Sequence, residues 1–253
     1  MQTVVTKAFD NDKIDGRCLK PFRRTKRLLR KGSNARRSIV TFDQYLKLID
    51  AASPHYRAVL VIALNTGMRL SEIKNLRWSY IDRKTKFIRL PKEATKEGAP
   101  KDIPINHHVE VALDALPRAL QHDFIITYQG KALDGKSSLK KQFPETCQKA
   151  GIVHGRKHPE GITFHDIRRT VKTNMLIAGV DKVYRDSILG HSLKGTDIHY
   201  LVVNNEMLTK AMKRYTTWLD GQLESQNVDH SVDQDNNPKN KILKKMLQTR
   251  DHK

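Results

Sequence analysis

The sequence has few cysteines and no long apolar run. Its two cysteines, Cys18 and Cys147, are too few for a disulfide framework. No stretch approaches the roughly 20 apolar residues that a membrane-spanning helix needs. The opening segment, MQTVVTKAFDNDK, also lacks the charged and then apolar pattern of a signal peptide. We therefore expect a soluble protein of the reducing cytoplasm, with no membrane partner.

Acidic residues are also scarce relative to basic ones. Lysine and arginine total 47 against 27 acids, which gives a formal net charge of +20. Solubility alone does not require so large a charge, so a polyanionic partner is expected. Nucleic acid is the commonest such partner, because each cation placed on a phosphate releases a counterion. An anionic membrane surface is a weaker alternative, because the sequence shows no basic amphipathic helix with a strong apolar face.

The chain divides into three parts by composition. Residues 1–37 end in a segment dense in positive charge, which is either a basic arm that contacts phosphates or a solvated linker. Residues 38–221 carry enough apolar residues to form one core. Residues 222–253 are polar and are expected to be largely disordered. The arm residues that we select as phosphate contacts are Arg23, Arg24, Lys26 and Arg27.

Two helices and a hairpin open the central part. Thr41 and Gln44 have the T-x-x-Q spacing of a capping box, so a helix begins after Thr41. The next helix begins at Ser53-Pro54, is apolar nearly all round and ends at Gly67, which makes it the expected centre of the core. The β-like runs KFIRLP and DIPIN, separated by ATKEGAPK, then predict a hairpin.

The later elements are mostly helical. Helices are predicted near 71–76 and 109–116, at 138–150 with a kink at Pro144, and at 166–178, 182–189 and 206–219, with a short strand at 124–127. The sequence therefore predicts a mainly α fold with a small antiparallel β-sheet.

Five polar side chains are weak signals when each is taken alone. An arginine after a helix end, such as Arg69, most often faces solvent or helix carbonyls. His165 and Arg168 stand three apart at a helix start, where an anion can bind, although a surface pair is the commoner explanation. His191 follows a glycine that ends a helix, and a tyrosine such as Tyr200 is ordinarily half-buried.

The same residues have a different meaning as an ordered set. Two arginines, two histidines, a hairpin lysine and a tyrosine are the groups needed for transesterification at a phosphodiester. In chain order they stand in T-G-M-R-L-S-E-I, T-K-E-G, H-D-I-R-R-T and L-G-H-S, followed by a tyrosine nine residues after that histidine. This set resembles the tyrosine recombinases, also called phage integrases, over roughly residues 39–219.

The resemblance implies a tyrosine-recombinase catalytic domain over residues 38–221. It implies site-specific DNA recombination through a 3′-phosphotyrosine, without a metal or other cofactor, by a nucleoid-associated protein. The partners would be double-stranded DNA and further copies of the chain, as dimers and tetramers on DNA. Matched by motif, the catalytic residues are Arg69, Lys96, His165, Arg168, His191 and Tyr200, with Glu72 orienting Arg69.

Elementary chemistry supports these roles. Bidentate guanidinium groups match the charge that develops on an attacked phosphate, so Arg69 and Arg168 would clamp it and His191 would add a hydrogen bond. A tyrosine with its usual pKa of about 10 is mostly protonated at neutral pH, and His165 is the candidate acceptor for the proton of Tyr200. Lys96 would protonate the leaving 5′-oxygen. Lys92 and Lys101 are the alternatives to Lys96, and with Arg169 they are expected to contact DNA phosphates.

Several alternatives remain open. A type IB topoisomerase uses the same phosphotyrosine chemistry. A regulatory remnant is a further alternative, because only about forty residues precede the first predicted helix of the catalytic domain, fewer than a core-binding domain needs. Zinc binding by Cys147, His154, His158 and His165 fits no compact ligand spacing, and His107 and His108 are expected to be exposed and without function.

The last predicted helix bears on assembly. Its apolar residues recur at steps of three and four and form one stripe: Leu208, Met212, Tyr215 and Leu219. The stripe either covers the chain's own core or, as the resemblance implies, carries the helix into a neighbouring subunit on DNA.

Overall fold

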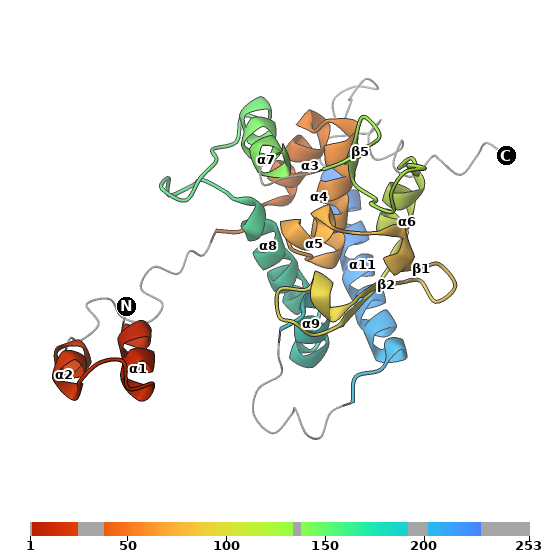
Figure 1. Ribbon diagram of the computed structural model, residues 1–253. Coiled ribbons are helices and arrows are strands. Elements are labelled where there is room, and N and C mark those ends of the chain that lie inside the picture. The colour runs from red at the N-terminus through yellow and green to blue at the C-terminus, as the bar shows by residue number, and fades with distance from the viewer. Residues whose placement is uncertain (1, 25–37, 134–137, 192–201, 229–253) are drawn as a thin grey trace. The chain divides into compact units, whose positions relative to one another are not determined.

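The computed structural model describes residues 2–24, 38–133, 138–191 and 202–228 (Figure 1). The chain divides into two compact units, residues 1–37 and 38–253. The first unit, expected as a basic arm or linker, holds helices α1 (Gln2–Asp10) and α2 (Gly16–Arg24), which pack on each other. Among the described residues, no helix is both long enough and apolar enough to cross a membrane.

The second unit is mostly helical, which confirms the predicted fold class. Its α-helices are α3 (Phe42–Ala51), α4 (Pro54–Thr66), α5 (Leu70–Lys74), α6 (His107–Asp114), α7 (Ser138–Lys149), α8 (Phe164–Ile177), α9 (Lys182–Leu189) and α11 (Asn205–Val228). Short 3-10 helices are η1 (Trp78–Tyr80) and η2 (Lys92–Ala94). The predicted kink residue, Pro144, lies inside α7.

Helix α4 is the centre of the core, as predicted. It contacts α3, α5, α6 and α8, and all of its residues from Ala58 to Thr66 are buried (Figure 1). The helix ends at Gly67, whose φ of 65° lies in the left-handed region that glycine adopts without strain. The capping box of α3 is confirmed, because the Gln44 N–H donates to Thr41 Oγ1 at 3.2 Å and the Thr41 N–H donates to Gln44 Oε1 at 3.1 Å.

The predicted hairpin belongs to a three-stranded antiparallel sheet. Strand β2 (Phe87–Leu90) pairs on one side with β1 (Ile81–Asp82) and on the other with β3 (Lys101–Pro104), with Leu90 opposite Lys101. A second sheet pairs β4 (Thr127–Tyr128) with β5 (Lys131–Ala132). The strand predicted at 124–127 therefore overlaps β4 only at Thr127. Ile125 and Ile126 are buried in irregular chain, and Phe124 forms an isolated bridge with Arg77.

Helix α11 covers the core of its own chain. Leu208, Met212, Tyr215 and Leu219 are all at most 5% exposed, and the Tyr215 hydroxyl donates to the Leu64 carbonyl at 2.8 Å. The structure thus favours the explanation that this stripe covers the chain's own core. The helix is also longer than predicted, since it continues to Val228 beyond the expected domain end at residue 221.

Candidate active site

Arg69 is fixed by a buried carboxylate. It precedes α5, and Glu72 stands three residues later on that helix. Glu72 Oε2 accepts a hydrogen bond from the Arg69 backbone N–H at 3.0 Å, and Glu72 Oε1 accepts one from Arg69 Nη1 at 2.9 Å. Because Glu72 is only 2% exposed, these bonds are shielded from water and hold both ends of the arginine. Glu72 thus contacts Arg69, and its orienting role stays a prediction.

Lys101 shares that carboxylate. Its Nζ donates to Glu72 Oε2 at 2.7 Å, and its side chain is 2% exposed. The predicted phosphate contact by Lys101 disagrees with this position, because the ammonium group is buried as the counter-charge of Glu72. Burial raises the pKa of Glu72, but Lys101 and Arg69 outweigh burial and lower it. Burial likewise lowers the pKa of Lys101, against the attraction of Glu72.

Arg168 is anchored by the ends of two helices. Its Nη1 donates to the carbonyl of Gly67 at 2.7 Å, and its Nη2 donates to the carbonyl of Leu189, the last residue of α9. Carbonyls at helix C-termini lack helical partners and carry partial negative charge, so a cation is stabilised there. Burial, followed by the nearby charge of Arg69, lowers the pKa of Arg168 to about 10. The side chain therefore remains a cation at neutral pH.

His191 lies beside Arg168. Arg168 Nη2 lies 3.2 Å from His191 Nε2. The other ring nitrogen, Nδ1, lies 3.2 Å from both Asp186 Oδ1 and Lys172 Nζ. Burial would raise the pKa of Asp186, but hydrogen bonds from Lys172, Lys182 and His191 outweigh it and hold that pKa at about 2. Asp186 is thus a charged anchor for His191.

Asp186 was not selected from the sequence. Its i, i+4 spacing from Lys182 signals a helix-surface ion pair, and the structure contains that pair at 3.0 Å. The sequence does not show that Lys172, from α8, reaches the same carboxylate at 2.9 Å.

His165 and Arg169 lie on α8 beside Arg168. Burial, and then the charges of Arg168 and Arg169, lower the pKa of His165. A neutral imidazole at physiological pH can accept a proton. Arg169 Nη1 donates to Asp166 Oδ1 at 2.6 Å and to the Ser38 carbonyl at 3.2 Å. The guanidinium group of Arg169 is therefore already engaged within the domain, with a third of its side chain exposed.

The connection between β2 and β3 carries exposed lysines and an acid. Lys92 and Lys96 are both exposed there. Next to Lys96, Glu97 accepts hydrogen bonds from both terminal nitrogens of Arg69, with Arg69 Nη1 at 2.9 Å from Glu97 Oε2. Glu97 was not selected from the sequence, because one acid in a lysine-bearing loop carries no signal of its own.

A groove of about 540 Å³ borders these residues. It is lined by Glu97, Lys101, Gly190 and His191 on one part and by Val203 and Leu208 on another. The described chain stops at His191 and resumes at Val202, so residues on both sides of the Tyr200 segment reach this groove. Tyr200 itself lies outside the described residues. A larger apolar groove of about 690 Å³, between α4, α6 and the β4–β5 hairpin, is lined by none of the described catalytic candidates.

The other predicted phosphate contacts, and the residues weighed and rejected as zinc ligands, have the following positions. Arg23 and Arg24 are exposed in the last turn of α2, whereas Lys26 and Arg27 lie outside the described residues. Cys147 is a buried core thiol whose pKa is raised to about 12 by burial, and His154 and His158 are exposed.

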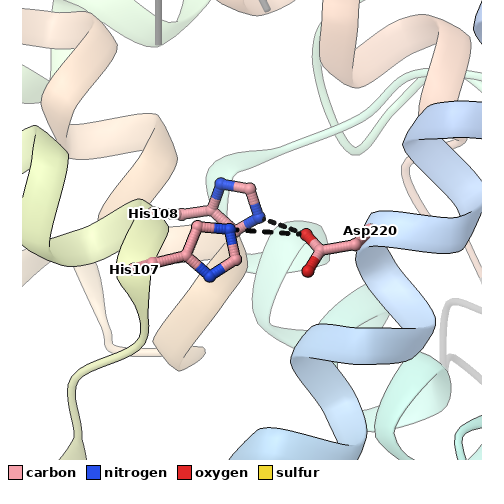
Figure 2. Close-up of side chains that lie close together, drawn as sticks. All are labelled: His107, His108 and Asp220. Carbon is pink, nitrogen blue, oxygen red and sulfur yellow. Dashed lines mark hydrogen bonds and ion pairs between the residues drawn. The ribbon is translucent and has the colours of Figure 1, made fainter. Parts of the chain in front are cut away.

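The expectation for His108 is wrong. Its side chain is 10% exposed and its Nε2 lies 2.7 Å from Asp220 Oδ1, because α6 and α11 meet at this point (Figure 2).

Comparison with known proteins gives one family. Residues 38–207 match the model of the phage integrase family. Tyrosine recombinase XerA of Pyrococcus furiosus is 26% identical over 158 residues, which cover 62% of this chain and 54% of the relative. The integrase of Salmonella phage P22 is 31% identical over 147 residues, covering 53% of this chain and 35% of the relative. The chain spans about half the length of the curated relatives it matches.

Solved structures share the fold. A lambda integrase tetramer bound to a Holliday junction superposes with a TM-score of 0.58 at 20% identity, covering 80% of this chain and 60% of that one. A XerA recombinase gives 0.53 at 22% identity, covering 71% and 65%. The lambda integrase catalytic core gives 0.51 at 21% identity, with 63% of this chain matched to 94% of that one.

The buried pair of Glu72 and Lys101 predicts a specific pattern of stabilities. Glu72→Gln leaves Lys101 buried without a counter-charge, so the free energy of unfolding should fall by about 3–5 kcal/mol. Lys101→Met, added to Glu72→Gln, removes the unpaired ammonium and should recover a large part of that loss. Urea unfolding of the two single variants and the double variant measures the coupling. Losses that simply add in the double variant would contradict the pairing.

Proposed function

The chain belongs to the phage integrase family, and from this premise we propose that it recombines DNA site-specifically, with Tyr200 as the nucleophile. The observation that carries the proposal is that two anchored arginines, Arg69 and Arg168, lie close to His191, which lines a groove. Arg69 lies close enough to Arg168 to lower its pKa. Arg168 Nη2 lies 3.2 Å from Nε2 of His191, which lines the groove. Two guanidinium groups with an imidazole beside them suit one phosphate group.

The reaction begins with attack of the Tyr200 oxygen on a DNA phosphorus. The bond from phosphorus to the 5′-oxygen breaks, and the 3′-phosphate remains on the tyrosine. His165, whose pKa is lowered, accepts the tyrosine proton. Lys96 supplies a proton to the leaving 5′-oxygen. A 5′-hydroxyl of a partner strand then attacks the phosphotyrosine, which reverses each transfer and rejoins the DNA.

The arginines stabilise the transition state. The attacked phosphate gains negative charge on its non-bridging oxygens, and donors that are already held in place stabilise that charge without reorganising. The carboxylate of Glu72 holds Arg69, and the carbonyls of Gly67 and Leu189 hold Arg168. Both side chains therefore meet the structural requirement for a preorganised phosphate clamp.

The proposed partners are double-stranded DNA and further copies of the chain. A net charge of +20 suits a DNA backbone, and the structural neighbours include lambda integrase as a dimer on a core site and as a tetramer on a Holliday junction. We infer that this chain also binds double-stranded DNA and associates there as dimers and tetramers. The exposed arm residues, Arg23 and Arg24, and the hairpin lysine Lys92 are the proposed phosphate contacts outside the clamp.

Covalent capture tests this function. Nicked duplexes that carry candidate sites and release a short 5′-hydroxyl strand should trap the wild-type chain as a DNA–protein adduct. Tyr200→Phe should abolish the adduct and leave the dissociation constant for duplex DNA nearly unchanged, because only the nucleophilic oxygen is removed. Tyr184→Phe, at a half-buried tyrosine of α9, is the matched control and should keep the adduct.

An adduct that persists in Tyr200→Phe would overturn the assignment of the nucleophile. Relaxation of supercoiled DNA without any recombinant product would instead indicate the topoisomerase alternative.

A further inference from the structure

Two histidines and an aspartate from different helices point at one position. His107 and His108 are the first two residues of α6, and Asp220 lies on α11. His108 Nε2 lies 2.7 Å from Asp220 Oδ1, and His107 Nε2 lies 3.6 Å from the same oxygen. One ligand atom from each residue lies within 4.8 Å of the other two. Figure 2 shows both rings turned toward the carboxylate.

The spacing suits a metal ion. Zinc binds imidazole nitrogen and carboxylate oxygen at about 2.0–2.2 Å, so ligand atoms about 3–4 Å apart can share one ion. The two imidazole rings have centroids only 3.9 Å apart, and two protonated rings at that separation would repel each other. One cation between neutral rings and the carboxylate satisfies all three groups. We propose that His107, His108 and Asp220 bind a divalent transition-metal ion of the zinc class.

Burial gives this site one enclosed ligand and an open side. The His108 side chain is 10% exposed, whereas His107 and Asp220 are 41% and 36% exposed. An ion can therefore enter from solvent, and water can complete its coordination. The bound ion would join α6 to α11, the helix that follows the Tyr200 segment. Its role is to hold α11 on the core, and it takes no part in the phosphotyrosine chemistry.

Zinc binding to the full chain tests the proposal. A competition titration against a chromophoric chelator should show one Zn²⁺ per chain. Zn²⁺ should also raise the thermal unfolding midpoint, and excess chelator should reverse that rise. Asp220→Asn keeps the side-chain size and should weaken zinc binding at least tenfold, as should His107→Ala. His158→Ala, at an exposed histidine elsewhere, and Cys18→Ser, at an exposed thiol, should leave it unchanged.

Co²⁺ absorption supplies a second readout. Visible bands of the cobalt-loaded chain should report nitrogen and oxygen ligands and should disappear in Asp220→Asn. Absence of zinc binding at 100-fold excess over the protein would overturn the site, and so would binding that survives both ligand substitutions.

A separate observation concerns Glu97, and this second inference rests on the proposed function. The guanidinium group of Arg69 donates from both terminal nitrogens to the two carboxylate oxygens of Glu97. The side chains of Arg69 and Glu97 are 17% and 29% exposed. A phosphate needs the same two-pronged face of the arginine. Glu97 and a DNA phosphate therefore compete for Arg69.

We infer that Glu97 is an internal anion that occupies Arg69 in the free protein and is displaced by the DNA phosphate. Glu72 holds the other side of Arg69 from the buried interior, so the arginine stays in place when Glu97 leaves. Because Lys96 is the neighbouring residue, displacement of Glu97 also moves the proposed proton donor. Arrival of the phosphate is thus coupled to placement of Lys96.

Charge removal at Glu97 tests this competition. Glu97→Gln should lower the dissociation constant for a one-site duplex severalfold and speed single-turnover adduct formation. Glu93→Gln, at an exposed acid of the same connection, changes the net charge equally and measures the general electrostatic effect. Equal effects of the two substitutions would overturn the inference.

The duplex affinities are measured in the Tyr200→Phe background, where no cleavage occurs. If no protein forms adducts but Glu97→Gln still binds duplex more tightly than Glu93→Gln, the proposed function fails and the competition stands. If adducts form at equal rates and affinities are equal, the competition fails and the function stands.

Discussion

The buried carboxylate of Glu72 is the interaction on which the site depends. It accepts hydrogen bonds from Arg69 on one side and from Lys101 on the other, and so joins the start of α5 to strand β3. An isolated buried charge would be strongly destabilising, but two cations compensate this one. The β2–β3 connection, which carries Lys96 and Glu97, is therefore positioned relative to Arg69 by a contact that solvent does not weaken.

Arg168 is held by backbone carbonyls rather than by a carboxylate. Arg168 compensates the free carbonyls at the ends of α4 and α9, so the helix geometry itself places its guanidinium group. For His191 the neighbouring group is the carboxylate of Asp186, 3.2 Å from Nδ1. Arg69, Arg168 and His191, the proposed phosphate ligands, are thus each in contact with another group of the same domain. A clamp of this kind stabilises developing charge efficiently, because its donors need not reorient during the reaction.

Local sequence signals predicted local structure well. The Thr41–Gln44 capping box, the apolar helix ending at Gly67 and the β2–β3 hairpin are all confirmed, because each depends on neighbouring residues. The pairing of Glu72 with Lys101, 29 residues apart, and of Asp186 with Lys172 depends on how elements pack. Nothing in the spacing of those residues reveals that packing. For the same reason the sequence predicted a phosphate contact for Lys101 and gave no sign of the contact between Glu97 and Arg69.

We propose that Arg69 and Arg168 together neutralise one scissile phosphate. The most direct measurement uses a duplex whose scissile phosphate carries a neutral methyl group in place of one charged oxygen. On an ordinary duplex, Arg69→Ala or Arg168→Ala should slow cleavage by about 10²–10³-fold. The neutral duplex has less negative charge to compensate. On it, the cleavage rate of at least one of these variants should therefore come close to the wild-type rate on the same duplex. If both variants are as impaired on the neutral duplex as on the ordinary one, the arginines do not act on that phosphate.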